Sequence, residues 1–197
     1  MESRVSVPLA PKLRFPALEE EGVAFMFTDA ARGQGTGHGA FTLVRAGSWL
    51  VFIYIDPRWP EEVLLALQEN EVSMPAGEGI GAVVGADALA EMLPGLRFLY
   101  VFTDSTAVVA ATQSSNSSSP QMNAVVRWLF DRRPQLQLVA LHQPGVRNGV
   151  ADALSRAGTD RVLAEARAAG AITLRIDCDA ATRAVSEIAL AVPQVAD

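Results

Sequence analysis

Two apolar segments of this chain end in the same three residues, and this repetition restricts the fold more than any other feature. Residues 23–28 run into Phe27-Thr28-Asp29, and residues 97–103 run into Phe102-Thr103-Asp104. Short continuous apolar runs predict strands that are buried on both faces, as in parallel pairing. If these two strands are parallel neighbours, about 4.8 Å apart, their terminal carboxylates stand side by side at one edge of the sheet.

The rest of the chain alternates between strand and helix patterns. Residues 40–46 and 48–55, joined by Ala46-Gly47, predict a hairpin, so the first three strands form an antiparallel meander. Alternating helices and strands after a meander predict an α/β fold: a mixed five-stranded sheet with helices on both faces. The predicted helices span residues 60–70, 78–93, 104–113, 120–132 and 148–154, the fifth strand spans 136–141, and 142–147 is a loop.

The same patterns divide the chain into three parts. Residues 1–20 contain Pro8, Pro11 and Pro16 with little periodicity, which indicates an N-terminal arm or linker. Residues 21–157 form the predicted main domain. Residues 158–197 are a C-terminal extension that packs on the domain or follows it, with a helix near 159–169, a strand at 171–176 and a helix near 180–191.

Composition limits the setting in which the protein works. Half of its 197 residues are hydrophobic, which suits one domain with an added terminal element. No apolar run reaches the roughly 18 residues of a membrane span. The single cysteine, Cys178, cannot form an internal disulfide, and the N-terminal residues lack a signal-peptide pattern. We therefore expect an intracellular protein, cytoplasmic or nuclear.

The net charge of −6 argues mildly against a nucleic-acid partner, which usually requires a basic face. A metal-dependent nuclease, however, uses several acidic residues to hold its ions. Two ionised carboxylates as close as Asp29 and Asp104 repel each other unless a cation lies between them. Oxygen ligands suit Mg²⁺, so the sequence predicts a magnesium site at this edge of the sheet.

Each acidic residue also has a purely structural interpretation. An aspartate after a strand is often a turn residue or a helix N-cap. Glu78, at the predicted start of its helix, would interact favourably with the helix dipole, and Asp152, on the short helix after Asn148, would be a solvated surface residue. The functional interpretation therefore depends on the four residues as a set.

A dense motif near the end of the main domain resembles a known family. His142-Gln-Pro-Gly145-Val-Arg-Asn148-Gly-Val-Ala-Asp152-Ala-Leu-Ser-Arg156 resembles the closing motif of retrotransposon ribonuclease H domains, His-x-Pro-Gly and then Asn-x-x-Ala-Asp-x-Leu-Ser-Arg. The resemblance covers residues 22–157. Its other segments are Thr28-Asp29-Ala30 with Gly39-Ala40-Phe41, Glu78 with Ala82-Val83-Val84, and Val101-Phe102-Thr103-Asp104-Ser105 with Val108. Ser119-Pro120, with Arg127 and Leu129, is similar to the domains of tyrosine-recombinase (DIRS-like) retroelements.

The resemblance implies a ribonuclease H-like fold and an endonuclease that hydrolyses the RNA strand of RNA–DNA hybrids during retroelement reverse transcription. It implies two Mg²⁺ ions, which Mn²⁺ can replace, held by Asp29, Glu78, Asp104 and Asp152. Asp29 would contact both ions, Glu78 and Asp104 one of them, and Asp152 the other. A reverse transcriptase domain or another polyprotein segment is the implied protein partner.

Other residues of the matched segments have implied roles in the reaction. His142 matches a mobile-loop histidine that moves a proton or assists product release, and its alternative role is to cap a backbone group. Asn148 is either a contact to a ribose 2′-hydroxyl or a helix N-cap. The remaining candidates for substrate contacts are Ser105, Arg32, Arg127 and Arg147.

Two other functions stay open at the level of sequence. The first is a catalytically inactive module of the same fold, a scaffold or nucleic-acid-binding unit in a larger assembly. The glycine-rich segment around Glu78, residues 75–79, favours it, because glycine lowers helix propensity by about 1 kcal/mol and predicts a loosely held glutamate. The second is an exonuclease or integrase-like enzyme, which Ala31 disfavours because proofreading-type exonucleases usually carry a second acid there.

Overall fold

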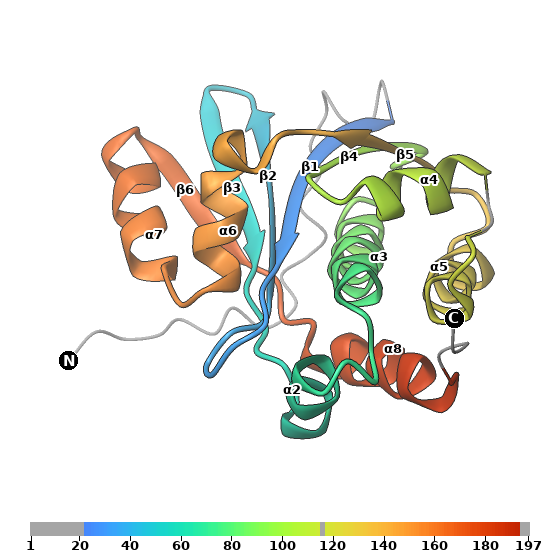
Figure 1. The fold of residues 1–197 in the computed structure, drawn as a ribbon. Coiled ribbons are helices and arrows are strands. Elements are labelled where there is room, and N and C mark those ends of the chain that lie inside the picture. Colours follow the sequence, from blue (N-terminus) through green and yellow to red (C-terminus); the bar gives the residue numbers. More distant parts are fainter. Residues whose placement is uncertain (1–21, 115–116, 194–197) are drawn as a thin grey trace.

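The computed structural model describes residues 22–114 and 117–193, which form a six-stranded mixed sheet with helices on both faces (Figure 1). The strands lie in the order β5-β4-β1-β2-β3-β6. β1, β2 and β3 are antiparallel neighbours, β4 and β5 continue the sheet in parallel from β1, and β6 is parallel to β3. Their bounds are β1 (Val23–Ala30), β2 (His38–Ala46), β3 (Trp49–Ile55), β4 (Phe98–Thr103), β5 (Gln137–His142) and β6 (Ala171–Arg175).

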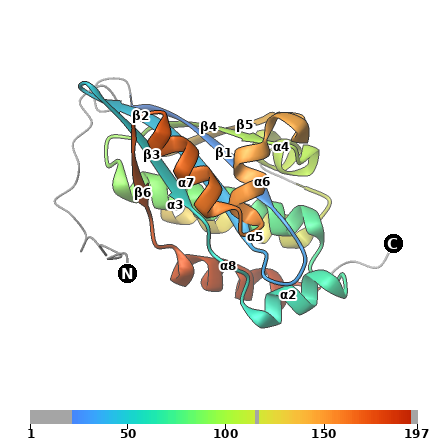
Figure 2. The ribbon, with the colours of Figure 1, turned by 90° about the vertical axis from the view of Figure 1, so that its left-hand side faces the viewer.

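Most helices cover one face of this sheet, and two cover part of the other (Figures 1 and 2). The larger group consists of α2 (Glu61–Gln68), α3 (Met74–Met92), α4 (Thr106–Ser114), α5 (Pro120–Arg132) and α8 (Asp179–Ala191). On the opposite face lie α6 (Gly149–Ser155), which follows the 3-10 turn η1 (Gly145–Arg147), and α7 (Thr159–Ala168). None of the helices in the described part of the chain has the length and apolarity needed to cross a membrane.

Helix α3 is the centre of the main core. It is buried nearly all round, because it lies between the sheet and α5 and also contacts α8. Glycines allow these close approaches: a Cβ at Gly79 would lie 2.7 Å from Met122 Sδ, and one at Gly85 would lie 2.8 Å from Met26 Sδ. A smaller core on the other face joins Phe52 and Tyr54 to residues of α6 and α7.

The predicted α/β fold is confirmed, with two corrections. The sheet has six strands instead of five, because β6 pairs with the outer edge of β3, Leu50 opposite Ala171, where β3 would otherwise leave backbone groups unpaired. Helix α3 begins at Met74, one turn before the predicted start at residue 78. Ser73 is its N-cap, and the Ser73 side chain accepts a hydrogen bond from the Ala76 N–H at 3.3 Å.

The segment after residue 157 is joined closely to the rest of the chain. His38, which is fully buried at the start of β2, hydrogen-bonds through Nε2 to Thr182 Oγ1 on α8 at 2.9 Å. Gln121 Nε2 on α5 donates to the carbonyl oxygen of Val192 at 3.1 Å. On β6, Arg175 Nε lies 2.6 Å from Asp56 Oδ1. The division at residue 157 therefore stays a prediction, while the contacts show that both parts share one core.

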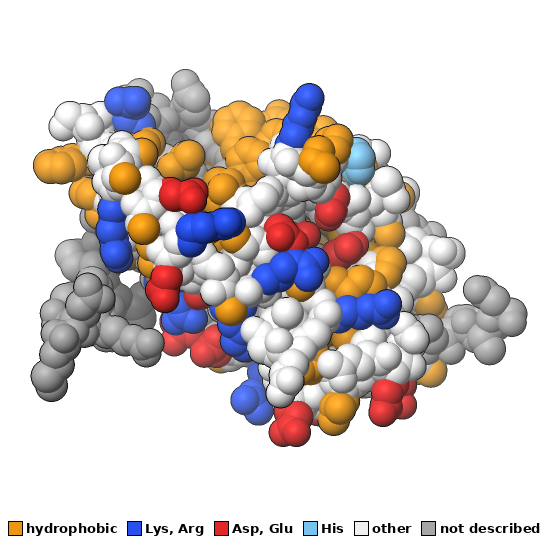
Figure 3. Space-filling model, turned by 60° about the vertical axis from the view of Figure 1, so that its left-hand side comes forward, with side chains coloured by type: hydrophobic (Ala, Val, Ile, Leu, Met, Phe, Trp, Pro, Cys, Tyr) orange, Lys and Arg blue, Asp and Glu red, His pale blue; other side chains and the backbone are white. Residues whose placement is uncertain are grey.

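Aromatic side chains line the face of the sheet opposite α3. Phe25 stacks on Tyr100, and Phe27 stacks on both Phe41 and Phe102, with ring centroids 4.8–5.4 Å apart. Hydrophobic side chains accordingly gather along the upper rim of the molecule (Figure 3). Because side chains alternate along a strand, Asp29 follows Phe25 and Phe27 on this same face.

Candidate active site

The parallel pairing of β1 and β4 brings two of the predicted carboxylates to one edge of the sheet. Phe27 is opposite Phe102, so Asp29 and Asp104 stand at matching positions two residues further along. After Asp104 the chain turns directly into α4, where Ser105 Oγ accepts a hydrogen bond from the Val108 N–H at 3.3 Å. The expectation that these strands are parallel neighbours is confirmed.

Helix α6 carries the third carboxylate, Asp152, against the same edge. It lies directly on Gly39 of β2, the residue paired with Asp29: a Cβ there would be 2.5 Å from Leu154 Cβ and 2.7 Å from the backbone nitrogen of Ser155. This contact allows Ser155 Oγ to donate a 2.7 Å hydrogen bond to Asp29 Oδ2. Asp152 lies one turn before Ser155 on α6. The helix therefore carries one acidic residue, Asp152, and hydrogen-bonds to another, Asp29.

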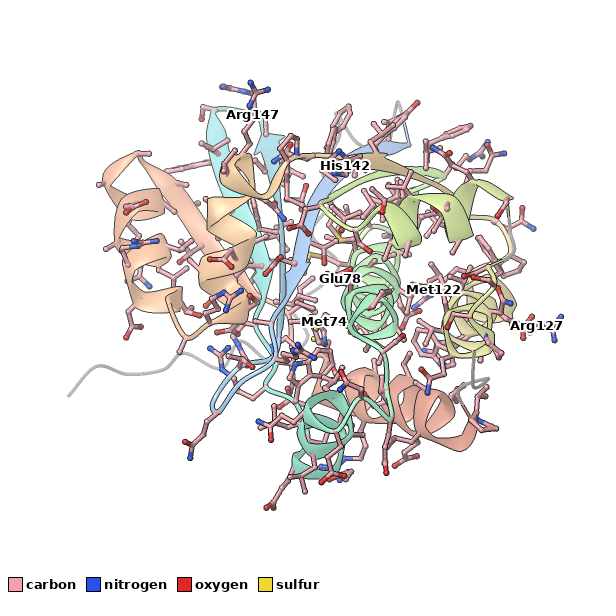
Figure 4. All side chains as sticks on the ribbon, viewed as in Figure 1. Met74, Glu78, Met122, Arg127, His142 and Arg147 are labelled. Atoms are coloured by element: carbon pink, nitrogen blue, oxygen red, sulfur yellow. The ribbon has the colours of Figure 1, made fainter. Side chains whose placement is uncertain are left out.

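Helix α3 contributes the fourth carboxylate from the other face of the sheet. Glu78 lies in the second turn of α3 and is half-buried (Figure 4). Gly79, next to Glu78, lies close to Met122, so this part of α3 packs against α5. That the glycines leave Glu78 loosely held stays a prediction.

The four carboxylates are close enough to influence each other's ionisation. Burial raises the pKa of Asp29 to about 6; the hydrogen bond from Ser155 lowers it, the charges of Asp104 and Asp152 raise it, and Arg156 lowers it. The pKa of Glu78 is also raised, first by burial and then by the charges of Asp104 and Asp29, against a hydrogen bond from Ser105 that lowers it. Chain segments up to 123 residues apart in sequence, Asp29 to Asp152, thus form one electrostatically coupled group.

The chemistry of this group suits divalent cations. All its donors are carboxylate oxygens, and Asp104 Oδ1 is buried without a hydrogen bond from any described residue. As the side chains stand, however, no three histidine, cysteine or acidic residues in the described ranges converge on a single ion position. Three of the four carboxylates have other partners: Asp29 Oδ2 accepts from Ser155, Glu78 accepts from Ser105, and Asp152 Oδ1 accepts from Arg156 Nε at 2.5 Å.

His142 and Arg147 lie beside this edge, with exposed side chains (Figure 4). His142 is the last residue of β5, opposite Thr103, so the predicted loop begins one residue later than expected. A hydrogen bond from the Gln143 N–H to Thr103 O extends the pairing by one residue and explains this shift. His142 therefore ends β5, the strand next to β4, and Asp104 directly follows β4. Arg147, in η1, points outward from the rim.

The remaining candidates are distributed differently. Asn148 stands at the N-cap position of α6, but its side chain caps nothing there; instead its Nδ2 donates to the carbonyl oxygen of Thr28 at 2.8 Å. The N-cap interpretation is therefore right about the position of Asn148 and wrong about its side chain, which does not cap the helix. Ser105 is buried and caps α4. Arg32 donates to Asn70 Oδ1 at 3.0 Å, and Arg127 lies on the side of α5 that faces away from α3 (Figure 4).

Three residues that shape the site, Gly39, Ser155 and Arg156, have no role among the sequence-based predictions. Ser155 and Arg156 follow Asp152 by three and four positions, a spacing that places side chains on one face of a helix and could have indicated the contacts. Gly39, by contrast, carries no local signal of its role, because only the packing of α6 onto β2 requires a residue without a side chain there.

Comparisons with known proteins give a distant likeness in structure alone. No family model and no curated protein matches the sequence. Among solved structures, RNase H1 from the halophilic archaeon Halobacterium salinarum NRC-1 is 16% identical, with a TM-score of 0.46 over 71% of this chain and 98% of that one. The N-terminal RNase H domain of Rv2228c from Mycobacterium tuberculosis is 17% identical, with a TM-score of 0.43 over 73% and 98%.

These two structures are ribonuclease H proteins. A third, a foamy viral protease-reverse transcriptase in complex with dsDNA, is 16% identical, with a TM-score of 0.37 over 69% of this chain and 92% of that one. At such identities and TM-scores the likeness carries no conclusion about function.

Proposed function

We propose that this protein is an endonuclease that hydrolyses the RNA strand of RNA–DNA hybrids with two Mg²⁺ ions, which Mn²⁺ can replace. The observation that carries the proposal is the gathering of four carboxylates into one electrostatic group: Asp29 from β1, Glu78 from α3, Asp104 from the turn after β4, and Asp152 from α6. Burying carboxylates beside one another is unfavourable, and a stable domain has no need of it. A bound divalent cation would convert the repulsion into coordination.

In this mechanism the four carboxylates would hold the metal ions. The ions would activate the attacking water and stabilise the leaving oxygen. Asp29 is central to the group, because its charge interacts with both Asp104 and Asp152, and Ser155 fixes the orientation of its carboxylate. His142 is exposed next to this edge, where it would move a proton or assist product release, as predicted.

The same rim would contact the substrate. Arg147 is exposed beyond the acidic edge and would pair with a backbone phosphate. Recognition of RNA would depend on a 2′-hydroxyl contact made near Asn148, its predicted role, and Ser105 would be a further substrate contact. Arg32 and Arg127 have no contact with the acidic group among the described residues and take no part in this proposal.

The proposed setting is an intracellular retroelement complex of the DIRS-like type. A reverse transcriptase domain would supply the RNA–DNA hybrid that this domain degrades. The matching segment at Ser119-Pro120, the start of α5, supports the subtype.

A cleavage assay with a strand-labelled hybrid tests the proposed activity. We expect Mg²⁺- or Mn²⁺-dependent cutting of the RNA strand, its loss in EDTA, and a decrease of at least about 100-fold in Asp104→Asn, because even partners of metal ligands contribute 10- to 100-fold. Asp131→Asn, an exposed residue of α5, is the matched control and should cut normally. Cutting of the DNA strand, or of single-stranded or duplex DNA alone, would instead indicate an exonuclease or integrase-like enzyme.

One observation favours a second candidate, an inactive scaffold or nucleic-acid-binding module of the same fold. The acidic side chains do not converge on one point, and Arg156 already neutralises Asp152. A scaffold would take up no Mn²⁺ in a calorimetric titration and would leave the hybrid intact at every metal concentration. Saturable Mn²⁺ uptake that is lost in Asp29→Asn would exclude it.

A further inference from the structure

One arginine lies inside the acidic group and is not explained by the proposed chemistry. Arg156 follows the last residue of α6, four positions after Asp152, and its Nε is 2.5 Å from Asp152 Oδ1. Both side chains are about half exposed, at 54% and 47%. An isolated, half-exposed ion pair of this kind contributes little to stability. The position of Arg156 beside the other carboxylates is therefore more informative than the pair itself.

The surroundings of Arg156 differ from those of an ordinary surface pair. Its pKa is raised first by the hydrogen bond to Asp152, and then by the charges of Asp152, Asp29 and Asp104. Arg156 in turn favours the ionised form of Asp29. Its guanidinium therefore provides the positive charge for a group of carboxylates that would otherwise repel one another.

We propose that Arg156 is a built-in counter-ion that holds the Asp152 carboxylate in the metal-free protein and releases it when a divalent cation binds. This inference rests on the proposed metal-dependent function. As the side chains stand, Asp152 Oδ1 accepts the hydrogen bond from Arg156 Nε at 2.5 Å, so this oxygen already has a partner where a cation would need it. The cation and the guanidinium compete for the same oxygen.

The competition has two consequences of opposite sign. Removing the guanidinium leaves the carboxylates without a counter-ion, so the metal-free protein becomes less stable. It also removes a competing charge, so Mn²⁺ binds more tightly. A residue that only supported the end of α6 would produce the first effect without the second.

The full chain offers a matched control. Arg161 on α7 pairs with Glu165 at the same spacing of four residues, in the reverse order, with Nε 3.8 Å from Oε1, and both side chains are about 70% exposed. Arg161→Gln therefore removes a helical ion pair of the same spacing that includes none of the four carboxylates. Arg156→Lys retains the positive charge, while Arg156→Gln and Arg156→Met remove it in two different ways.

The experiment is a calorimetric titration of each full-length variant with Mn²⁺ alone, together with melting temperatures in EDTA and in saturating Mn²⁺. We expect Arg156→Gln and Arg156→Met to lower the Kd for Mn²⁺ by about five- to tenfold, the size expected for removing one adjacent charge at a partly exposed site. In EDTA, both variants should melt at a lower temperature than the parent. Saturating Mn²⁺ should raise their melting temperature by more than it raises that of the parent. Arg161→Gln and Arg156→Lys should bind Mn²⁺ as the parent does.

The outcomes separate the two proposals. If the parent binds Mn²⁺ and the neutral variants bind it equally or more weakly, the counter-ion role of Arg156 is overturned while the metal-dependent function stands. If neither the parent nor the variants bind Mn²⁺, the proposed function fails and the counter-ion role fails with it.

Discussion

At the scale of single residues, two buried ionisable groups give opposite pH dependences. Asp29 has a pKa raised from 3.8 to about 6, first by burial, so its ionisation is less favourable in the folded state than in the unfolded state. Its contribution to stability is therefore lost as the pH rises from about 4 to 6. Burial lowers the pKa of His38 from 6.5 to about 3, so its contribution is lost as the pH falls below 6.5.

Asp29→Asn should therefore stabilise the metal-free protein at neutral pH. The raised pKa corresponds to roughly 3 kcal/mol of unfolding free energy above pH 6, and to no gain below pH 4. Urea unfolding in EDTA, followed from pH 4 to 8 for the parent and the variant, measures this difference. Asp131→Asn is the control, and a pH-independent difference for Asp29→Asn would contradict the assignment.

The opposite dependence of His38 becomes visible once Asp29 no longer titrates. In the Asp29→Asn background, the free energy of unfolding should decrease by roughly 2 kcal/mol between pH 6.5 and 5, because only the unfolded chain binds the proton at His38. The same unfolding series measures it. Stability that stays constant over this interval would show that His38 is accessible to protons in the folded protein.

At the scale of elements, the contact between α6 and β2 decides whether Asp152 reaches the other carboxylates. It depends on Gly39, where no Cβ can be accommodated without moving Leu154 or Ser155. The contacts that Met122 and Met26 make with Gly79 and Gly85 fix α3, which carries Glu78, in the same way.

Gly39→Ala should destabilise the protein by about 1–3 kcal/mol, as overpacking does, and should decrease hybrid cleavage more than stability alone explains, because α6 carries Asp152. Gly149→Ala, at the first position of α6 with nothing within 4 Å of the added Cβ, should be neutral or stabilising by up to about 1 kcal/mol. Thermal unfolding and cleavage rates of both variants test this. Equal behaviour of the two alanines would show that α6 adjusts freely.

At the scale of the whole molecule, the C-terminal segment completes the fold. Val185 and Ala189 of α8 are fully buried, β6 closes the edge of β3, and Thr182 is the hydrogen-bond partner of buried His38. Without this segment, apolar side chains of the main core and the Nε2 of His38 would lose their partners.

A protein shortened to residues 21–157 should therefore unfold at a much lower temperature than the full chain, or fail to fold cooperatively. Circular dichroism melting curves of both proteins measure the difference. A double substitution in the full chain, Thr182→Val with Val185→Ala, should give an intermediate loss of about 2–4 kcal/mol, the sum of a cavity and an unpaired buried group. If the shortened protein melts as the full chain does, residues 158–197 are a separate extension.

The sequence by itself determined the order of elements, the two strands that lead to Asp29 and Asp104, and the motif that carries Asp152. These follow from local causes: runs of apolar residues, glycine and proline at turns, and the period of a helix or strand. The same local reasoning placed the start of α3 one turn late, because the glycines around Glu78 disfavour a helix unless tertiary packing compensates.

Only the tertiary structure decided how the acidic residues are held and charged. The raised pKa of Asp29, the bond from Ser155, the pairing of Arg156 with Asp152 and the place of β6 beside β3 all depend on segments far apart in the chain. Burial and charge–charge interaction act through space, and a sequence specifies such distances only through the packing of the whole fold. A glycine such as Gly39 shows this most plainly, because its importance lies in the helix that another part of the chain places against it.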